Sequence, residues 1–283
     1  MSEKSTLLPP VSRRLKHATS RRLQSLRRGE REMPHYFIVG AKRAGTTSLD
    51  EYIVDHPLVL RGLVEKGCRY YDVNYHRGPA WFRGHLPLSA DLDRMEARLG
   101  ARPVFGESSP YYCFHPEAAA RIAADAPDAR LIMVLRDPVQ RAWSHVRYEI
   151  TREFETLEPV AALEAEAERL AQPDEQARWY AHRHFSYAAR SRYAEQIVAL
   201  RRHFDDDQLL VVQSEDVFDR PAETLARVFD HLGLPPHVAS DYRAHKALKA
   251  AAVPDDFRAA LLERIADDTA RLRDVLETPP TWA

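Results

Sequence analysis

A glycine-rich turn between an apolar run and a helical pattern is the part of the sequence best suited to chemistry. The apolar residues 37–39 lead into residues 40–48, which read GAKRAGTTS, and residues 46–55 have the pattern of a helix. Such a turn directs successive backbone N–H groups and a helix N-terminus into one concavity, which suits a phosphate group. Glycines at both ends of the turn allow the backbone to approach a ligand closely.

The cations of this loop distinguish it from the loop of a nucleotide triphosphatase. In that loop a lysine follows the second glycine and reaches the β- and γ-phosphates, whereas here Thr46 has that position and Lys42 and Arg43 precede the glycine. The loop therefore favours a ligand with one 5′-phosphate that carries a second oxyanion. We expect Arg43 to face the oxygen that joins these two groups, with Lys42 as the alternative. Donors to the ligand are expected from Arg43, Ala44, Gly45, Thr46, Thr47 and Ser48.

A second anion site is predicted at the end of another buried strand. The apolar residues 131–135 are followed by Arg136, then by Asp137 and Pro138, which predict the start of a helix that contains Ser144. Ligands of open α/β sheets bind at the carboxyl ends of the strands. Arg136 offers a planar set of donors and Ser144 a hydroxyl. Together with the glycine-rich loop, they predict two phosphate subsites, as for a nucleoside with 5′- and 3′-phosphates.

The elements that must position these residues alternate between short apolar runs and helical patterns. This alternation predicts an α/β fold with a parallel sheet flanked by helices. Strands are expected at 36–39, 104–105, 131–135 and 209–212, and helices at 46–55, 116–126 and from about 138, 193, 221 and 257 onward. Residues 58–90 are interpreted as irregular. We expect one domain over 35–283, preceded by a basic, poorly ordered arm over 1–34.

Composition excludes several classes of protein. A chain of 283 residues that is 45% hydrophobic can bury a substantial core, which excludes wholesale disorder. Its apolar runs fall far short of the ~20 residues of a membrane span, and no secretory signal is evident. Cys68 and Cys113 provide neither a disulfide framework nor metal-ligand spacing. We therefore expect a cytoplasmic protein without a metal site.

The N-terminal arm is strongly basic, although the whole chain carries 41 Lys and Arg against 42 Asp and Glu. Residues 13–31 hold eight basic residues and one acid, Glu30. A solvated leader is the expected state, because chain termini are often poorly ordered. Peripheral contact with an anionic surface, such as the inner face of a membrane, is the alternative. Nucleic acid is not an expected partner.

The motifs resemble those of sulfotransferases that depend on 3′-phosphoadenylyl sulfate (PAPS), of the bacterial type related to heparan-sulfate and glycolipid sulfotransferases. Residues 40–49 resemble the 5′-phosphosulfate loop of that family, and residues 136–144 resemble its 3′-phosphate motif. Further similarity lies at 70–75, 81–82, 85–87, 106–111, 191–193, 214–216 and 229–234. The resemblance implies a P-loop-like sulfotransferase fold and PAPS as the donor cosubstrate. It also implies a hydroxyl or amine of a carbohydrate, glycolipid or small molecule as acceptor, adenosine 3′,5′-bisphosphate as product, and no metal.

The sequence departs from the family at the general base. Many relatives carry a glutamate directly after a lysine in the substrate segment, and alignment on residues 70–72 places Lys66 and Gly67 at these two positions. General-base assistance typically contributes ~10²–10⁴-fold. We rank Glu65 first as a substitute, then Glu107, then His76, and transfer without a protein base is a further option that suits an acidic phenol.

A phosphate-binding loop also occurs in two other classes of protein, nucleotide kinases or NTPases and non-catalytic nucleotide-binding proteins. A nucleotide kinase or NTPase would have a lysine at position 46 and a strand that ends in a magnesium-binding aspartate, whereas position 46 is a threonine and Leu135 is followed by Arg136. A non-catalytic nucleotide-binding protein is consistent with the missing glutamate. Isolated histidines, including His182 and His184, are interpreted as surface residues.

Overall fold

The computed structural model describes residues 26–61, 67–242 and 252–283. At its centre lies a five-stranded sheet with the strand order β2-β3-β1-β4-β5 and parallel pairing throughout. The strands are β1 (Tyr36–Gly40), β2 (Val59–Leu60), β3 (Val104–Ser108), β4 (Arg130–Leu135) and β5 (Leu209–Gln213). The predicted parallel α/β fold is confirmed.

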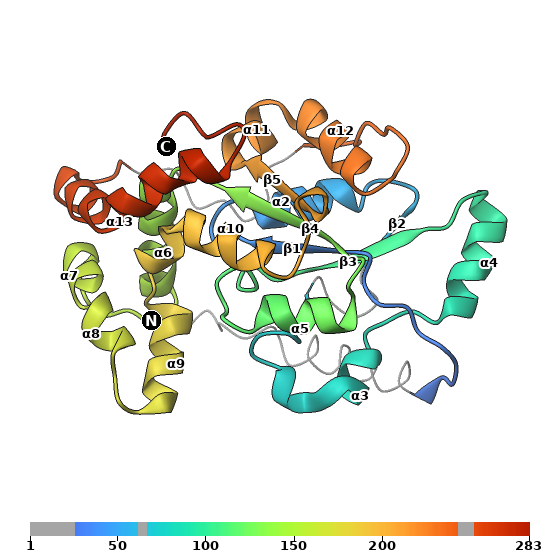
Figure 1. Ribbon diagram of the computed structural model, residues 1–283, viewed down its shortest axis with the longest axis horizontal. Helices are drawn as coiled ribbons and strands as arrows, with labels where there is room; N and C mark the ends of the chain where they lie inside the picture. The colour runs from blue at the N-terminus through green and yellow to red at the C-terminus, as the bar shows by residue number, and fades with distance from the viewer. Residues whose placement is uncertain (1–25, 62–66, 243–251) are drawn as a thin grey trace, which may run out of the picture.

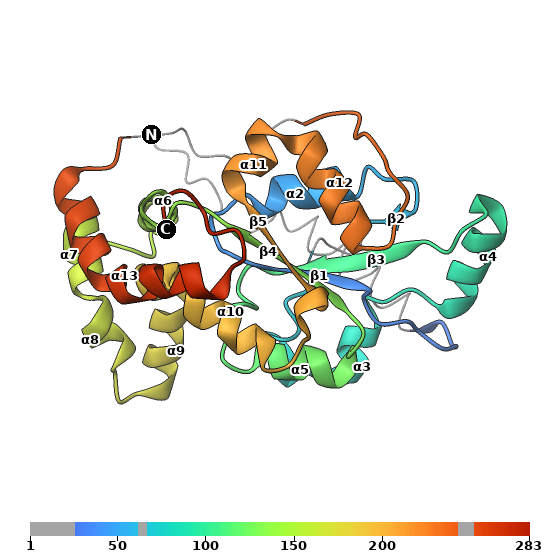
Figure 2. The ribbon, with the colours of Figure 1, turned by 45° about the horizontal axis from the view of Figure 1, so that its top comes forward.

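Helices cover both faces of the sheet and its carboxyl end. In Figures 1 and 2, α2, α11 and α12 lie over one face, α5 and α10 lie over the other, and α6–α9 gather with α13 beyond the carboxyl ends of the central strands. The helices are α2 (Thr46–Ile53), α3 (Gly78–Arg83), α4 (Ser89–Leu99), α5 (Ala118–Asp125), α6 (Pro138–Thr151), α7 (Pro159–Glu164), α8 (Glu166–Leu170), α9 (Glu175–His184), α10 (Tyr193–Arg201), α11 (Ser214–Asp219), α12 (Pro221–His231) and α13 (Asp255–Val275). Short 3₁₀ turns occur at η1 (Tyr75–Arg77), η2 (Ala189–Ser191) and η3 (Asp206–Gln208).

The two central strands bring the predicted anion sites together. β1 is buried along its whole length, and β4 is buried at every residue after Arg130. They are adjacent and paired, with Phe37 opposite Leu131 and Gly40 opposite Met133, and the register shifts between Ile38 and Gly40. Because parallel strands end at the same edge, the loop after β1 and the residues after β4 lie side by side.

A second apolar cluster fixes the helices at this edge. It joins α6, α7 and α13 through residues that include Val139, Leu163, Phe257 and Leu261. Full burial of each such side chain contributes about 1.5–3 kcal/mol. The carboxylate of Asp268, on α13, accepts hydrogen bonds from the first backbone N–H groups of α10, each at 3.0 Å. The apolar cluster thereby holds α6, whose residues line the site, against α7 and α13.

The segment 58–90 is more regular than predicted. It contains β2, η1, α3 and the start of α4. β2 has only two residues and is defined by its pairing with β3, which a local pattern does not reveal. β3 likewise runs three residues beyond its predicted end because it pairs with β1. In α3, a proline in the first turn starts a helix too short for an apolar period to be recognised.

Most of the predicted basic arm lies outside the described residues. Within the described part, the exposed Arg27 forms an ion pair with Asp91 at the start of α4. No helix of the described part combines the length and the apolarity needed to cross a membrane.

Candidate active site

The glycine-rich loop joins β1 to α2 and presents the N-terminus of α2. Gly45 caps this helix with a φ of 95°, in the left-handed region that favours glycine. A side chain at this position would also crowd Phe218, whose ring atoms lie 3.1 Å from the place of a Cβ atom. Thr46 and Thr47 form the first turn of α2 and line the neighbouring cavity. The first N–H groups of this helix are therefore placed to bind an anion.

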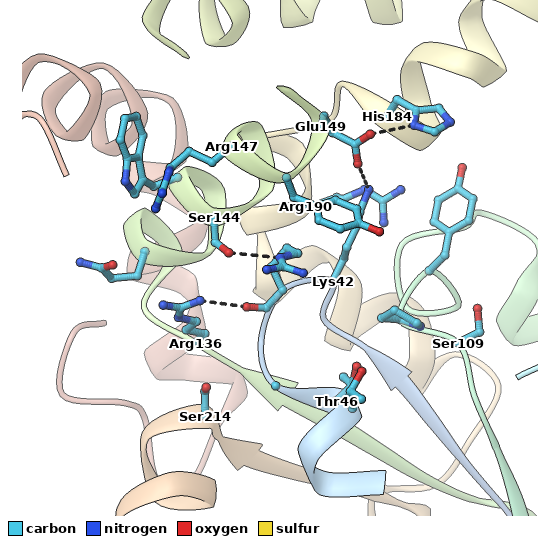
Figure 3. Close-up of a pocket in the computed structure, with 18 of the residues that line it drawn as sticks. Lys42, Thr46, Ser109, Arg136, Ser144, Arg147, Glu149, His184, Arg190 and Ser214 are labelled. Carbon is cyan, nitrogen blue, oxygen red and sulfur yellow. Dashed lines mark hydrogen bonds and ion pairs between the residues drawn. The ribbon is translucent and has the colours of Figure 1, made fainter. Parts of the chain in front are cut away.

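The cavity has a volume of about 920 Å³ and a strong excess of positive charge (Figure 3). Of the residues that line it, eight are Lys or Arg and three are Asp or Glu. The cations are Lys42, Arg43, Arg69, Arg136, Arg147, Arg152, Arg183 and Arg190, and the acids are Glu149, Glu215 and Asp219. A cavity of this size accommodates a nucleotide-sized ligand, and its charge suits one with several anionic groups.

Arg43 links the loop to the predicted second anion site. Its Nε donates to the Ser144 hydroxyl at 3.1 Å, and its carbonyl accepts a hydrogen bond from Arg136 Nη1 at 3.1 Å. The guanidinium group of Arg43 also lies 4.6 Å from the centre of the Tyr148 ring. Asp137 starts α6 by accepting the backbone N–H of Gln140 at 2.8 Å, which fixes the helix that carries Ser144. Arg43, Arg136 and Ser144 therefore lie together in one wall of the cavity.

Lys42 is directed toward a different part of α6. Its Nζ lies 2.6 Å from Oε1 of the buried Glu149, and Oε2 of Glu149 lies 2.9 Å from Nδ1 of His184 (Figure 3). Burial and the charge of Arg190 lower the pKa of Lys42 to about 7, against the opposing effect of Glu149. Interactions with His145 and His184, together with the charge of Lys42, hold the pKa of Glu149 well below its usual range despite its burial. Glu149 is thus the anionic centre of this group.

Arg190 is a buried cation that sequence reasoning missed. It is 2% exposed, and its guanidinium carbon lies 4.3 and 4.6 Å from the ring centres of Tyr111 and Phe114. Nη2 donates to the carbonyls of His182 and Arg183 at 3.2 Å, while Nε and Nη1 have no hydrogen-bond partner among the described residues. Burial lowers its pKa to about 10. The one indication of its importance in the sequence is that Arg190 directly precedes residues 191–193, a segment that resembles the family.

Two of the remaining predicted ligand residues lie behind the loop. Ala44 and Ser48 are fully buried and are not among the residues that line the cavity, whereas Gly45, Thr46 and Thr47 are. Of the predicted segment 43–48, the cavity is therefore lined by Arg43 and by residues 45–47.

Of the predicted general bases, the two that the structure describes do not line the cavity. Glu107 is buried away from the lining, and its Oε1 accepts hydrogen bonds from the Tyr112 hydroxyl at 2.7 Å and the Arg69 backbone N–H at 2.8 Å. Burial raises the pKa of Glu107 to about 7. His76 is exposed in η1 and does not line the cavity, and Glu65 lies outside the described residues.

The position of the family's usual glutamate is closed to any side chain. A Cβ atom on Gly67 would lie 2.2 Å from the carbonyl oxygen of Ser108, at the end of β3. This neighbour is backbone within the sheet, so it has little freedom to move. At the position where many relatives carry the glutamate, this chain therefore needs glycine, because the Ser108 carbonyl lies too close for a side chain.

The surface interpretation of His184 is wrong. His184 is 7% exposed, lines the cavity and packs against the rings of Phe154 and Tyr180 at centre distances of 4.5 and 4.6 Å. His182 is half-buried, and its Nδ1 lies 2.6 Å from the Tyr111 hydroxyl oxygen. A histidine at the end of a polar helix gives no local sign of burial, because the aromatic neighbours come partly from the turn after α6.

Both cysteines, Cys68 and Cys113, are free and buried. Across residues 26–61, 67–242 and 252–283, no group of three or more His, Cys, Asp or Glu side chains is placed to hold a metal ion.

Comparison with known proteins identifies the family. The profile of the Sulfotransferase family matches residues 34–238. The chain is 31% identical over 208 residues to heparan sulfate glucosamine 3-O-sulfotransferase 3A1 of Mus musculus, covering 73% of this chain and 47% of that protein. It is 32% identical over 206 residues to heparan sulfate glucosamine 3-O-sulfotransferase 6 of Homo sapiens, covering 73% and 54%. The chain thus spans about half the length of the curated relatives it matches.

A solved structure extends the similarity to nearly the whole fold. The crystal structure of a sulfotransferase from Alicyclobacillus acidocaldarius aligns with a TM-score of 0.67 and 27% identity, covering 89% of this chain and 99% of that one. Its fold and the family profile agree with the resemblance inferred from the loop and strand-end motifs. The chain belongs to the sulfotransferase family.

Proposed function

We propose that the protein transfers a sulfonate group from PAPS to a hydroxyl group of a carbohydrate and releases adenosine 3′,5′-bisphosphate (PAP). The observation that carries the proposal is the meeting of two anion-binding groups in one cavity. One is the loop with the N-terminus of α2, and the other is Arg136 with Ser144. The relatives that act on heparan sulfate support a carbohydrate acceptor. Family membership alone also allows a glycolipid, an amine or a small-molecule hydroxyl.

The residues of the cavity fit such a donor. The helix N-terminus and the hydroxyls of Thr46 and Thr47 would hold the 5′-phosphate, and Arg136 and Ser144 would hold the 3′-phosphate. The excess of lining cations and the two donors of Arg190 that lack partners among the described residues favour a ligand with several anionic oxygens. PAPS supplies a sulfonate group activated by a phosphate leaving group.

A loop cation would promote transfer by stabilising the leaving oxygen. Negative charge develops on the oxygen between phosphate and sulfonate as the bond breaks, so a cation there binds the transition state more tightly than the ground state. We propose Arg43 for this role because it belongs to the loop that would hold the 5′-phosphate and lines the cavity. Lys42 is the alternative, since it lines the same cavity one residue earlier.

Calorimetric titration with PAP and AMP tests the two phosphate subsites. We expect PAP to bind much more tightly than AMP, without added metal. A charge-assisted hydrogen bond contributes ~1.5–3 kcal/mol, so Arg136→Ala should weaken PAP binding by roughly ten- to a hundred-fold. It should leave the weaker AMP binding nearly unchanged.

A matched control lies at the other end of the strand that Arg136 follows. Arg130 begins β4 at the opposite end of the sheet and donates to the carbonyl of Asp207 at 2.6 Å, so Arg130→Ala should not alter PAP affinity. Equal affinity of the wild-type protein for PAP and AMP would contradict the proposal of two subsites.

A further inference from the structure

The glutamate that serves as general base in many relatives is replaced by Gly67 in this chain, and a histidine, His184, lines the cavity. Gly67 leaves no room for a side chain, and Glu107 is held away from the lining by three hydrogen bonds to its Oε1. An alcohol nevertheless needs to lose its proton as its oxygen bonds to sulfur. Glu65 lies outside the described residues, so among the residues described the candidates for a proton acceptor are those that line the cavity.

His184 is a residue of the cavity lining whose side chain can accept a proton. It ends α9 and lines the cavity together with Lys42 and Glu149. Its Nδ1 lies 2.9 Å from Glu149 Oε2, while Nε2 has no hydrogen-bond partner among the described residues. An ionised carboxylate only accepts hydrogen bonds, so the proton of a neutral imidazole is held at Nδ1. The lone pair of His184 is then at Nε2.

The same carboxylate connects His184 to a loop cation. Oε1 of Glu149 pairs with Lys42 Nζ at 2.6 Å, so a single carboxylate spans the ammonium group and the imidazole (Figure 3). Glu149 is therefore the only side chain between His184 and Lys42 in this chain of contacts, and Lys42 belongs to the loop that would hold the sulfonate donor. Three segments far apart in the sequence supply this group: the loop after β1, α6 and α9.

The surroundings of His184 keep the ring neutral near pH 7. Burial, with smaller contributions from Lys42 and Arg183, lowers its pKa below the usual 6.5, and Glu149 opposes this effect. The other groups packed on the ring are aromatic, and of these only Tyr180 is titratable, as a phenol. At neutral pH the imidazole is therefore available to accept a proton.

We propose that His184 is the general base of the transfer and that Glu149 is a positioning residue that orients its ring. The inference rests on the proposed sulfotransferase function. In the step, the acceptor oxygen forms a bond to sulfur while the bond from sulfur to the bridging oxygen breaks. That electron pair stays on the phosphate of the released PAP. The hydroxyl proton moves to Nε2 of His184 and then to solvent.

The variant His184→Asn separates this role from a structural one. The asparagine amide can still donate to Glu149 in place of Nδ1, but nothing replaces the lone pair of Nε2. We expect kcat at pH 7 to fall by ~100-fold or more, while PAP affinity measured by calorimetry is unchanged. His203→Asn is the matched control, because His203 is exposed just beyond α10, and it should retain full activity.

The pH profile and chemical rescue provide readouts that a structural defect would not give. Wild-type kcat should fall on the acid side below pH 6.5 as His184 becomes protonated, and His184→Asn should lose this limb. Lys42, with a pKa of about 7, titrates nearby but would act on the alkaline side, where it loses its charge. In a His184→Ala variant, added imidazole should restore part of the lost rate.

The possible outcomes are distinguishable. A His184→Asn variant with wild-type kcat and an unchanged acid limb would overturn the assignment while the sulfotransferase function stands. A parallel loss of PAP affinity and kcat, without imidazole rescue, would assign His184 a structural role and also overturn it. If the wild-type protein neither binds PAP nor transfers sulfonate, the proposed function itself fails, and the inference fails with it.

Discussion

Replacing Glu107 with glutamine should stabilise the protein at alkaline pH and leave transfer intact. The buried carboxyl has its pKa raised to about 7 by burial, from 4.5 for an unperturbed glutamate. Folding therefore favours its protonated form. The interval from 4.5 to about 7, at about 1.36 kcal/mol for each pH unit, corresponds to about 3 kcal/mol. This contribution is fully present below pH 4.5 and is lost as the pH rises through about 7.

The substitution Glu107→Gln removes the charge and keeps an oxygen that can accept the hydrogen bonds from Arg69 and Tyr112. Urea unfolding of both proteins at an acidic and an alkaline pH measures the effect. The variant should match the wild type at the acidic pH and exceed it at the alkaline pH, by up to about 3 kcal/mol. Glu263→Gln, on an exposed position of α13, should show no such difference.

Activity of the same variant tests whether Glu107 is the general base. Because Glu107 lies away from the lining of the cavity, kcat should be close to that of the wild type. A stability difference that does not depend on pH would refute the assignment of a raised pKa. A loss of kcat by ~100-fold or more would move Glu107 into the chemistry.

Two further predictions concern the loop and the substrate segment. Arg43→Ala should lower kcat by ~100-fold or more while PAP still binds, as expected for a group that acts at the leaving oxygen. If Arg43→Ala keeps its kcat and Lys42→Ala loses activity, the role belongs to Lys42. Gly67→Glu should not raise kcat and should destabilise the protein by about 1–3 kcal/mol, because its Cβ would lie 2.2 Å from the Ser108 carbonyl. A stable, faster Gly67→Glu variant, measured by urea unfolding and initial rates, would show that the backbone can open there.

The sequence was sufficient to predict the sheet and the convergence of two motifs on its carboxyl edge. Long apolar runs identify β1 and β4, and parallel strands end at the same edge, so the loop and Arg136 were expected to be close. Their contact through the Arg43 carbonyl, at 3.1 Å from Arg136 Nη1, follows from that topology. The short strand β2 could not be predicted, because only its pairing with β3 makes it a strand.

The group formed by Lys42, Glu149 and His184 could not be predicted in the same way. Its members come from a loop and two helices, and no spacing in the sequence relates them. Glu149 lies near the end of α6, where a glutamate usually faces solvent, but here it is buried and packs against Lys42 of the loop and His184 of α9. The same packing buries His184, which is why a surface position was wrongly expected.

Transfer of label from PAPS tests the central claim most directly. The wild-type protein should be incubated with [³⁵S]PAPS and a panel of desulfated oligosaccharides, glycolipids, phenols and amines, with Arg136→Ala as the variant impaired in the donor site. We predict that radioactive sulfonate moves to a carbohydrate hydroxyl, that PAP is released in equal amount, and that the variant is much slower at limiting donor. Tight binding of PAP without transfer to any member of the panel would contradict the assignment as a sulfotransferase that uses these acceptors.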